Sequence, residues 1–225
     1  MIPTEVSLRS VTRGLPRPAQ QVTHRAAMAY TEVPAFMRKL QKQENSVGRD
    51  ALKLTNLTAV RSNETRFAAW GEFDLDAAVW PIPAARMKMK QPHLVPLSAP
   101  AVALLRRIRL EHEALYTGSL DERMLFTARG TKPISDATTL KAIRDMNIET
   151  VTVHGFRSSF ADWAAECTSF PKEVTDKALA HRVPNAVEGG VPAHGLLRQA
   201  ACAHGGVGSA RCRRQSRLRA IDLYP

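Results

Sequence analysis

The nine residues TVHGFRSSF, at positions 152–160, decide how the rest of this chain is interpreted. Gly155 ends an extended run at 151–153, and a helical apolar period begins after it, which is typical of a helix start. Helical spacing then puts His154 and Arg157 on one face. A guanidinium holds two phosphate oxygens in a planar fork, and an imidazole moves a proton near neutral pH. The pair therefore suits a phosphodiester, although such a pair alone is more often a solvated helix face.

Length and composition favour one domain with extensions. The chain has 225 residues, and its 44% hydrophobic content is enough for a real core. No apolar run approaches membrane-spanning length and no charged-then-apolar leader begins the chain, so we expect a cytoplasmic protein with no membrane partner. The three cysteines form no Cys-x-x-Cys pair, and Cys202, His204 and Cys212 lack a fourth ligand at zinc-finger spacing. We therefore expect no metal and no cofactor.

The net charge of +11 suggests a nucleic-acid partner, but its distribution weakens that argument. Residues 1–30 carry four Arg against one acid, and residues 182–225 carry seven Arg against two acids. The body from 31 to 181 carries 21 basic against 18 acidic residues, so the ends supply most of the excess. The total charge is therefore poor evidence that the body binds DNA, and individual residues with phosphate-binding chemistry are the better evidence.

Periodicity and capping residues predict helices around a single hairpin. Helices are expected from a Thr31 N-cap to about Gln43 and from 46–48 to about Val60; the second runs into 61–64, after which a short helix reaches Trp70. Later helices are expected after a Ser98 cap, from a Ser135 cap to Met146, from 155 to Glu166, and from Pro171 to Ala180. Strands are expected at 79–82 and 93–97, joined by a basic connection at 83–91. Pro81 confines the first strand to an edge or a strand end.

Three further segments carry side chains suited to phosphate chemistry. Arg61 and Glu64 stand three apart, an arrangement that alone is more often a helix-end ion pair. The hairpin connection carries Lys88 and Lys90, which alone would be a solvated basic turn. His181 follows the last expected helix, where a histidine is usually a cap or a surface group. Their order along the chain, rather than any one of them, is informative.

Together these segments resemble the catalytic domain of the tyrosine site-specific recombinases, most closely the phage- and prophage-type integrases. The resemblance covers roughly Ala27 to Glu188 and includes the LTAVRSNE box at 57–64 and the His-x-x-Arg box at 154–157. It implies an α+β fold: a mainly helical domain with a small antiparallel sheet, which agrees with the expected helices and hairpin. A type IB topoisomerase-like protein, which shares the active-site plan, is a more distant alternative.

The resemblance also implies roles for the residues at matching positions. Arg61 and Arg157 would bind the phosphate, with Glu64 supporting Arg61. His154, and His181 at the family's second histidine or tryptophan position, would complete the set that meets charge growing on the non-bridging oxygens.

The leaving group and the partners follow from the same resemblance. Lys88 lies seven residues before Val95, where the family keeps the lysine that protonates the leaving 5′ oxygen, and Lys90 is the nearby alternative. The family cleaves through a tyrosine that forms a 3′-phosphotyrosine, so it needs neither metal nor ATP. The implied partners are double-stranded attachment-site DNA and other integrase subunits in a tetramer, with affinity for DNA that depends strongly on salt.

The expected nucleophile is missing. The family places its tyrosine roughly ten residues after His181, and Val191 occupies that position. The remaining tyrosines are Tyr30 and Tyr116 in the body and Tyr224 near the end of the chain. We therefore expect a domain deficient in cleavage, because a single mobile tyrosine such as Tyr224 would lose the positioning that catalysis needs.

From Gly189 onward the composition changes abruptly. The 37 residues 189–225 hold half of the 12 glycines and two of the three cysteines, and they contain no Lys, Glu, Phe, Trp or Met. When codons are chosen for residues 189–197 and read one nucleotide later, they can encode AAYRRTDCF, a family-like segment containing a tyrosine. We infer a frameshift at this point; a disordered basic tail is the alternative.

These expectations divide the chain into a lead-in or linker at 1–26, an integrase-like catalytic domain at 27–188 and an unpatterned tail at 189–225. Residues 1–26 are too few for the core-binding domain that precedes the catalytic domain in full-length integrases, so the chain is expected to be a catalytic-domain fragment. The alternatives are a weak DNA-binding module and a degenerate remnant without activity.

Overall fold

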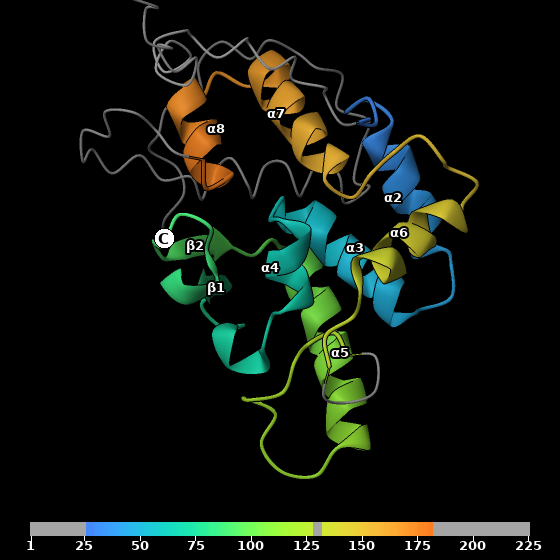
Figure 1. Ribbon diagram of the computed structural model, residues 1–225, viewed down its shortest axis with the longest axis vertical. Helices are drawn as coiled ribbons and strands as arrows, with labels where there is room; N and C mark the ends of the chain where they lie inside the picture. The colour runs from blue at the N-terminus through green and yellow to red at the C-terminus, as the bar shows by residue number, and fades with distance from the viewer. Residues whose placement is uncertain (1–25, 128–131, 182–225) are drawn as a thin grey trace, which may run out of the picture.

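The computed structural model describes residues 26–127 and 132–181. Its helices are α2 (Val33–Gln41), α3 (Val47–Thr58), α4 (Ser62–Arg66), α5 (Ala99–Leu115), α6 (Asp136–Arg144), α7 (Gly155–Cys167) and α8 (Lys172–Ala178), with 3-10 turns η1 (Trp70–Glu72) and η2 (Ala84–Arg86) and strands β1 (Val79–Ile82) and β2 (His93–Pro96). Figure 1 shows α3 and α4 in the middle of the molecule, α7 and α8 at one end, and the hairpin to one side. The predicted α+β class, mainly helical with a small antiparallel sheet, is confirmed.

The central helix α3 is buried along most of its length. The helix begins within the predicted range 46–48, and its N-terminus is capped by Ser46, whose hydroxyl accepts a hydrogen bond of 3.3 Å from the Arg49 amide. Its buried polar side chains donate to carbonyls four residues earlier: Thr55 to Ala51, Asn56 to Leu52 and Thr58 to Leu54. These bonds satisfy the polar groups locally, so α3 can pack against α5 and α6.

Several predicted helix boundaries were wrong by one to two residues, and the short helix predicted to reach Trp70 ends four residues earlier, at Arg66 of α4. Glu32, not Thr31, is the N-cap of α2, and its side chain makes no capping hydrogen bond; Pro34 lies in the first turn as predicted. Helix α6 ends at Arg144 rather than Met146. Helix α8 ends at Ala178 rather than Ala180, because Ala180 adopts a left-handed conformation with φ 49°. These ends depend on the packing of the following residues, which periodicity does not report.

The hairpin forms where it was predicted. Strands β1 and β2 pair antiparallel, with Trp80 opposite Val95 and Ile82 opposite His93. Both strands are edges of a two-stranded sheet, which accommodates Pro81 without loss of an interior ladder bond. Trp80 is fully buried and stacks on Phe73 with ring centroids 4.8 Å apart. The hairpin is therefore anchored in the core by its tryptophan.

A short segment at 26–28 lies against the start of α7. The Ala26 carbonyl accepts a hydrogen bond of 3.3 Å from the Thr152 amide, and the Ser159 hydroxyl donates to the Met28 carbonyl. A Cβ on Gly155 would lie 2.4 Å from the Ala26 oxygen, which is closer than real Cβ atoms approach. Glycine at position 155 thus permits this contact, in addition to starting the helix.

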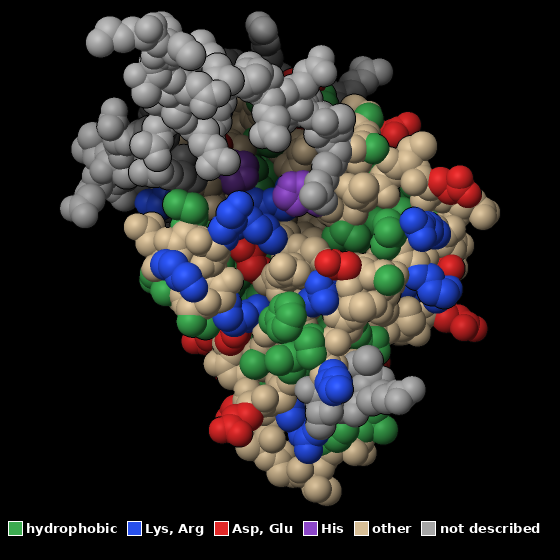
Figure 2. Space-filling model, viewed as in Figure 1, with side chains coloured by type: hydrophobic (Ala, Val, Ile, Leu, Met, Phe, Trp, Pro, Cys, Tyr) green, Lys and Arg blue, Asp and Glu red, His purple; other side chains and the backbone are tan. Residues whose placement is uncertain are grey.

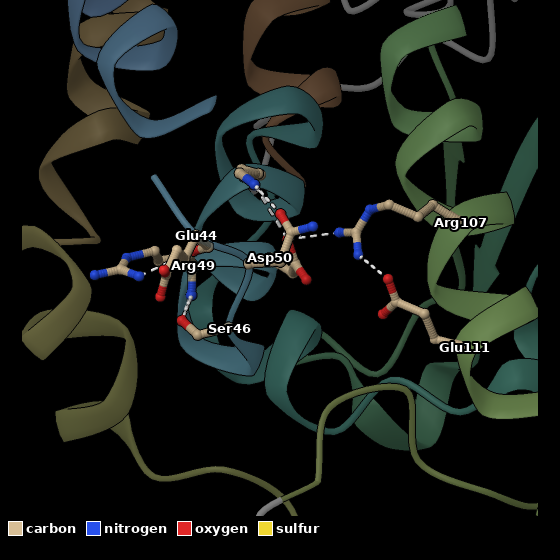
Figure 3. A network of polar contacts seen from close by, with 8 residues as sticks. Glu44, Ser46, Arg49, Asp50, Arg107 and Glu111 are labelled. Carbon is tan, nitrogen blue, oxygen red and sulfur yellow. Dashed lines mark hydrogen bonds and ion pairs between the residues drawn. The ribbon is translucent and has the colours of Figure 1, made fainter. Parts of the chain in front are cut away.

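A charged network joins α3 to α5 inside the domain (Figure 3). Asp50 is 5% exposed; its carboxylate accepts a hydrogen bond of 3.3 Å from Lys53 and forms an ion pair with Arg107 at 2.7 Å. Arg107 also pairs with Glu111 at 2.6 Å. In this network each cation has a carboxylate partner.

Within the described residues, no helix is both long enough and apolar enough to span a membrane.

Candidate active site

Arg157 lies in the first turn of α7, and only 5% of it is exposed. Its guanidinium donates to the carbonyls of Ala59 and Leu179, the latter at 2.6 Å, and one nitrogen lies 3.4 Å from His181 Nε2. Burial, and secondarily the charge of Arg61, lowers the pKa of Arg157 to about 10. The side chain is therefore not part of a solvated helix face.

Arg61 is the N-cap residue of α4, and its side chain reaches the segment after α8 that Arg157 also contacts. One guanidinium nitrogen lies 2.8 Å from a carboxylate oxygen of Glu64, and the other donates to the Ala180 carbonyl at 3.1 Å. The second Glu64 oxygen accepts from the Arg61 amide at 2.6 Å. The Glu64 side chain is 4% exposed and the Arg61 side chain 23%, so the pair is more enclosed than a surface ion pair.

The two guanidiniums are held by consecutive carbonyls. Arg157 binds that of Leu179 and Arg61 that of Ala180, directly before His181. We call Arg61, Glu64, Arg157 and His181 the arginine cluster. No ion pair in the described part of the chain joins Arg157 to a carboxylate, so two guanidiniums share Glu64 as their neighbouring acid. An anion bound here would relieve the repulsion between them.

Asp176 orients His181, a role that sequence reasoning missed. His181 Nδ1 lies 3.2 Å from Asp176 Oδ1, and the His181 amide donates to the Asp176 carbonyl at 2.8 Å. Burial tends to raise the pKa of Asp176, but hydrogen bonds from Lys172 and His181 outweigh it, so the pKa is lowered. The carboxylate turns the other ring nitrogen of His181 toward Arg157. The sequence did carry a signal for this contact, because Asp176 stands five residues before His181.

His154 and Lys88, the other predicted site residues, are exposed. His154 is the N-cap of α7, and its carbonyl accepts from the Arg157 amide at 3.1 Å, so the two residues share one helical turn. Lys88 lies in the connection between β1 and β2, beside the buried Met87. Lys90, the alternative lysine, is also exposed and has φ 55°. The structure thus pairs Arg61 with Glu64 and Arg157 with His181, and it brings the two pairs together at consecutive carbonyls. Lys88 and His154 are exposed.

His93 is a further residue at the site that sequence reasoning treated only as part of a strand. It lies at the start of β2 and is half-buried. Burial lowers its pKa; the charges of Arg157 and Arg61 act in the same direction, while Glu64 and a hydrogen bond to the Ala178 backbone oppose them. His93 therefore lies close enough to the arginine cluster for its charges to act on the imidazole.

Basic side chains gather around two histidines on one face of the molecule (Figure 2). Acidic side chains lie among these basic ones as well as farther out on the same face. Concentrated positive charge of this kind is the electrostatic pattern expected at a phosphate-binding surface.

A match to a known protein family assigns this chain to that family. The profile of the phage integrase family matches residues 27–188. The chain belongs to the phage integrase family.

Curated relatives of this integrase-family domain agree. It is 34% identical over 183 residues to the integrase of Enterobacteria phage P4, an alignment that covers 73% of this chain and 40% of the phage protein. It is 31% identical over 183 residues to the putative protein IntB of Escherichia coli (strain K12), covering 73% of this chain and 44% of that protein. The chain thus spans less than half the length of these relatives.

Solved structures share the fold of this integrase-family domain. XerH site-specific recombinase bound to its difH substrate superposes with a TM-score of 0.56 at 22% identity, over 70% of this chain and 47% of that one. XerA recombinase gives a TM-score of 0.56 at 15% identity, over 84% of this chain and 65% of that one. The XerH structure is a complex with its difH substrate. The Tn1549 transposon integrase, which gives a TM-score of 0.56 at 12% identity over 72% of this chain and 60% of that one, is in complex with a circular intermediate DNA.

Two groups of residues named in the sequence analysis lie in the tail at 189–225. Val191 and Tyr224, and the weak metal candidate Cys202, His204 and Cys212, all lie outside the described residues. Among residues 26–127 and 132–181, no three His, Cys, Asp or Glu side chains are grouped so as to hold a metal ion.

Proposed function

We propose that this protein is the DNA-binding catalytic domain of a site-specific integrase, and that the arginine cluster binds the scissile phosphodiester. The observation that carries the proposal is the convergence of Arg61 and Arg157 on consecutive carbonyls, with His181 3.4 Å from Arg157. Because the guanidiniums are fixed by the backbone, they need little reorganisation to receive a phosphate. Because they are under-neutralised, they favour an anion over a neutral ligand.

The remaining residues take roles around that phosphate. Arg61 and Arg157 hold the non-bridging oxygens, and Glu64 fixes Arg61. His154 and His181 donate further hydrogen bonds as charge develops on the phosphorus centre. Lys88 supplies the proton to the leaving 5′ oxygen. In this scheme no metal and no cofactor takes part, because the bond energy would be kept in a phosphotyrosine.

The proposed organisation keeps the boundaries inferred from the sequence. A lead-in at 1–26 precedes the catalytic domain at 27–188, and the tail at 189–225 follows it. The proposed partners are attachment-site duplex DNA and other integrase subunits in a tetramer, and the proposed place of action is the cytoplasm. The relative named as an integrase and the XerH recombinase complex with its difH substrate support this proposal.

We further propose that this chain is deficient in strand cleavage, because Val191 stands where the family's nucleophilic tyrosine is expected. A frameshift near Gly189 accounts for the loss and for the abrupt change in composition. Sequencing the encoding DNA across the codons for 186–192 in independent isolates tests this. An unshifted frame in every isolate contradicts the frameshift and leaves Tyr224 as the tyrosine to test.

Binding and cleavage are tested separately with the full chain. Duplex DNA should bind with an affinity that falls steeply as salt rises, and Arg61→Gln should weaken binding about tenfold, the loss of roughly 1.4 kcal/mol of a charge-assisted contact. The matched control is Arg106→Gln, which changes an exposed arginine of α5 paired with Asp76 at 3.4 Å. Equal effects of the two substitutions contradict a specific role for the arginine cluster.

Denaturing electrophoresis of protein mixed with labelled duplex reports covalent adducts. No adduct is expected from the wild-type chain, nor from Val191→Tyr, because residues after 191 would remain out of frame. Adduct from the wild-type chain contradicts the proposed deficiency. A chain that neither binds DNA nor unfolds cooperatively identifies the second candidate, a degenerate remnant, which the change in composition at Gly189 favours.

A further inference from the structure

Arg86 is an enclosed arginine that the proposed chemistry does not use. It lies in η2, at the start of the connection between β1 and β2, and its side chain is 19% exposed. Its guanidinium donates through one nitrogen to the Glu64 backbone carbonyl and through the other to the Glu72 carboxylate. A single side chain thus ties the hairpin to two separate segments, α4 and η1.

Glu72 is itself fixed by a second partner. Its carboxylate accepts a hydrogen bond of 2.9 Å from Trp80 Nε1, and the Glu72 side chain is 14% exposed. Trp80 is fully buried in β1. Because the carboxylate is anchored to the core, it gives Arg86 a rigid support.

The position of Arg86 in the chain links this support to Lys88. Arg86 precedes Lys88 by two residues, and the side chain of Met87 between them is 3% exposed. The Met87 amide donates to the Ala84 carbonyl at 3.1 Å. The backbone before Lys88 is therefore held by a buried side chain, a turn hydrogen bond and the Arg86 contacts.

Glu64 connects the same support to the arginine cluster. Its carboxylate holds Arg61, while its backbone carbonyl accepts from Arg86. Glu64 thus contacts both Arg61 and Arg86, so it fixes how far Arg61 lies from the hairpin. A change at Arg86 would alter where Lys88 stands relative to Arg61 without changing either side chain.

We propose that Arg86 is a positioning residue that, through Glu64 and Glu72, sets Lys88 against the phosphate held by Arg61 and Arg157. The inference rests on the proposed function, since it takes the phosphate site and the role of Lys88 from there. Arg86 does not touch the phosphate in this scheme. It places the proton donor, in the way that a supporting shell places a reacting group.

The test measures how accessible each lysine is to an acylating reagent in the full chain, with and without duplex DNA, by mass spectrometry. Bound DNA should slow acylation of wild-type Lys88 by about tenfold or more. In Arg86→Gln this protection should fall to about twofold, while protection of the other lysines and the affinity for duplex stay as in wild type. Arg86→Lys should give an intermediate result, because an ammonium lacks the fork that reaches two acceptors.

The matched control is Arg106→Gln, the same chemical change at an exposed arginine, and it should leave Lys88 protection unchanged. Unchanged protection of Lys88 in Arg86→Gln overturns the inference. A uniform loss of protection at all lysines, together with weaker binding, also overturns it, since that pattern marks general destabilisation.

Amide hydrogen exchange without DNA separates this inference from the proposed function. Arg86→Gln should speed exchange in residues 87–91 by about tenfold while exchange in α3 and α6 stays as in wild type. If the wild-type chain shows no DNA protection at any lysine, the proposed function fails, and the exchange result still decides whether Arg86 anchors the hairpin. Unchanged exchange at 87–91 overturns the anchoring in either case.

Discussion

Two groups of enclosed charges lie in this domain, and they differ in how completely they are neutralised. In the α3 to α5 network, Lys53 and Arg107 face Asp50, and Arg107 also pairs with Glu111. In the arginine cluster, two guanidiniums have Glu64 as their neighbouring carboxylate, and Arg157 is held by carbonyls instead. The first group is complete without a ligand. The second has the charge and the geometry to take one.

This contrast separates a structural ion network from a binding site. Burying a charge is costly unless it is paired, so a structural network ends with its charges matched. A site that keeps an excess of one sign stores unfavourable energy that a ligand of the other sign releases. The two groups should therefore respond differently to mutation and to added anion.

The largest effect is expected at Asp50. Asp50→Ala leaves Lys53 and Arg107 without their shared carboxylate, and we expect a loss of about 3 kcal/mol in the free energy of unfolding. Urea denaturation of the full chain measures it. Inorganic phosphate, which we expect to bind the arginine cluster and raise the melting temperature of the wild type, should still raise that of Asp50→Ala. A loss near zero would mean that the network is not a structural one.

At Arg157 we expect a small loss of stability and a complete loss of stabilisation by phosphate, the opposite of what we expect at Asp50. Arg157→Met removes an under-neutralised charge as well as its hydrogen bonds to carbonyls, so we expect a smaller loss of about 1 kcal/mol. Inorganic phosphate should raise the melting temperature of wild type by mass action but not that of Arg157→Met. Equal phosphate stabilisation of both proteins would place the anion elsewhere.

His93 and His112 offer a matched pair for sensing the anion. Burial lowers the pKa of both below the ordinary 6.5, but His93 also lies near Arg61 and Arg157, whereas His112 accepts a hydrogen bond of 2.9 Å from Trp70 Nε1. Phosphate in the arginine cluster should raise the pKa of His93 and leave that of His112 unchanged. Proton NMR titration, with peaks assigned by His93→Gln and His112→Asn, measures both values.

The same two histidines fix the sign of a pH dependence. Since their folded-state pKa values lie below 6.5, the unfolded chain binds protons more readily, and stability is lost as pH falls through that value. His112→Asn should flatten the fall between pH 7.5 and 5.5, because Asn keeps an acceptor that does not titrate. A slope that is unchanged in this variant would assign the pH dependence to other groups.

The smallest effect is expected from the exposed pair of Arg106 and Asp76. Their side chains are 61% and 100% exposed at a separation of 3.4 Å. Asp76→Asn should leave the free energy of unfolding at the wild-type value, because solvent screens the pair. Urea denaturation beside Asp50→Ala measures it, and a loss comparable to that of Asp50→Ala would remove the distinction between enclosed and exposed charges.

The sequence predicted elements whose signals are local. Ser98 and Ser135 were identified as caps, and both stand at the N-cap of their helix. The Ser98 hydroxyl accepts from the Ala101 amide as expected, whereas the Ser135 side chain makes no capping hydrogen bond. The hairpin and the apolar face of α3 followed from alternation and helical period. Thr31 failed as a cap because the residue that ends in the capping position is decided by how α2 packs, not by residue type alone.

Contacts made only by tertiary packing could not be predicted from local pattern. Arg61 and Arg157 were named from motifs, but nothing in the spacing indicated that consecutive carbonyls after α8 would hold both. His93 and Arg86 were passed over, because a strand residue and a turn arginine acquire their partners from α8, α4 and η1. Such partners become visible only when the elements are assembled.

The close contact at Gly155 has a consequence for protein engineering. Residues 26–28 and the turn before α7 fit each other at the level of backbone atoms, with no side chain at position 155 to adjust the gap. A chimera that takes these two segments from different parents would combine surfaces that were never matched. Any exchange of what precedes the domain should therefore have its junction before Ala26, so that both halves of the contact come from one parent.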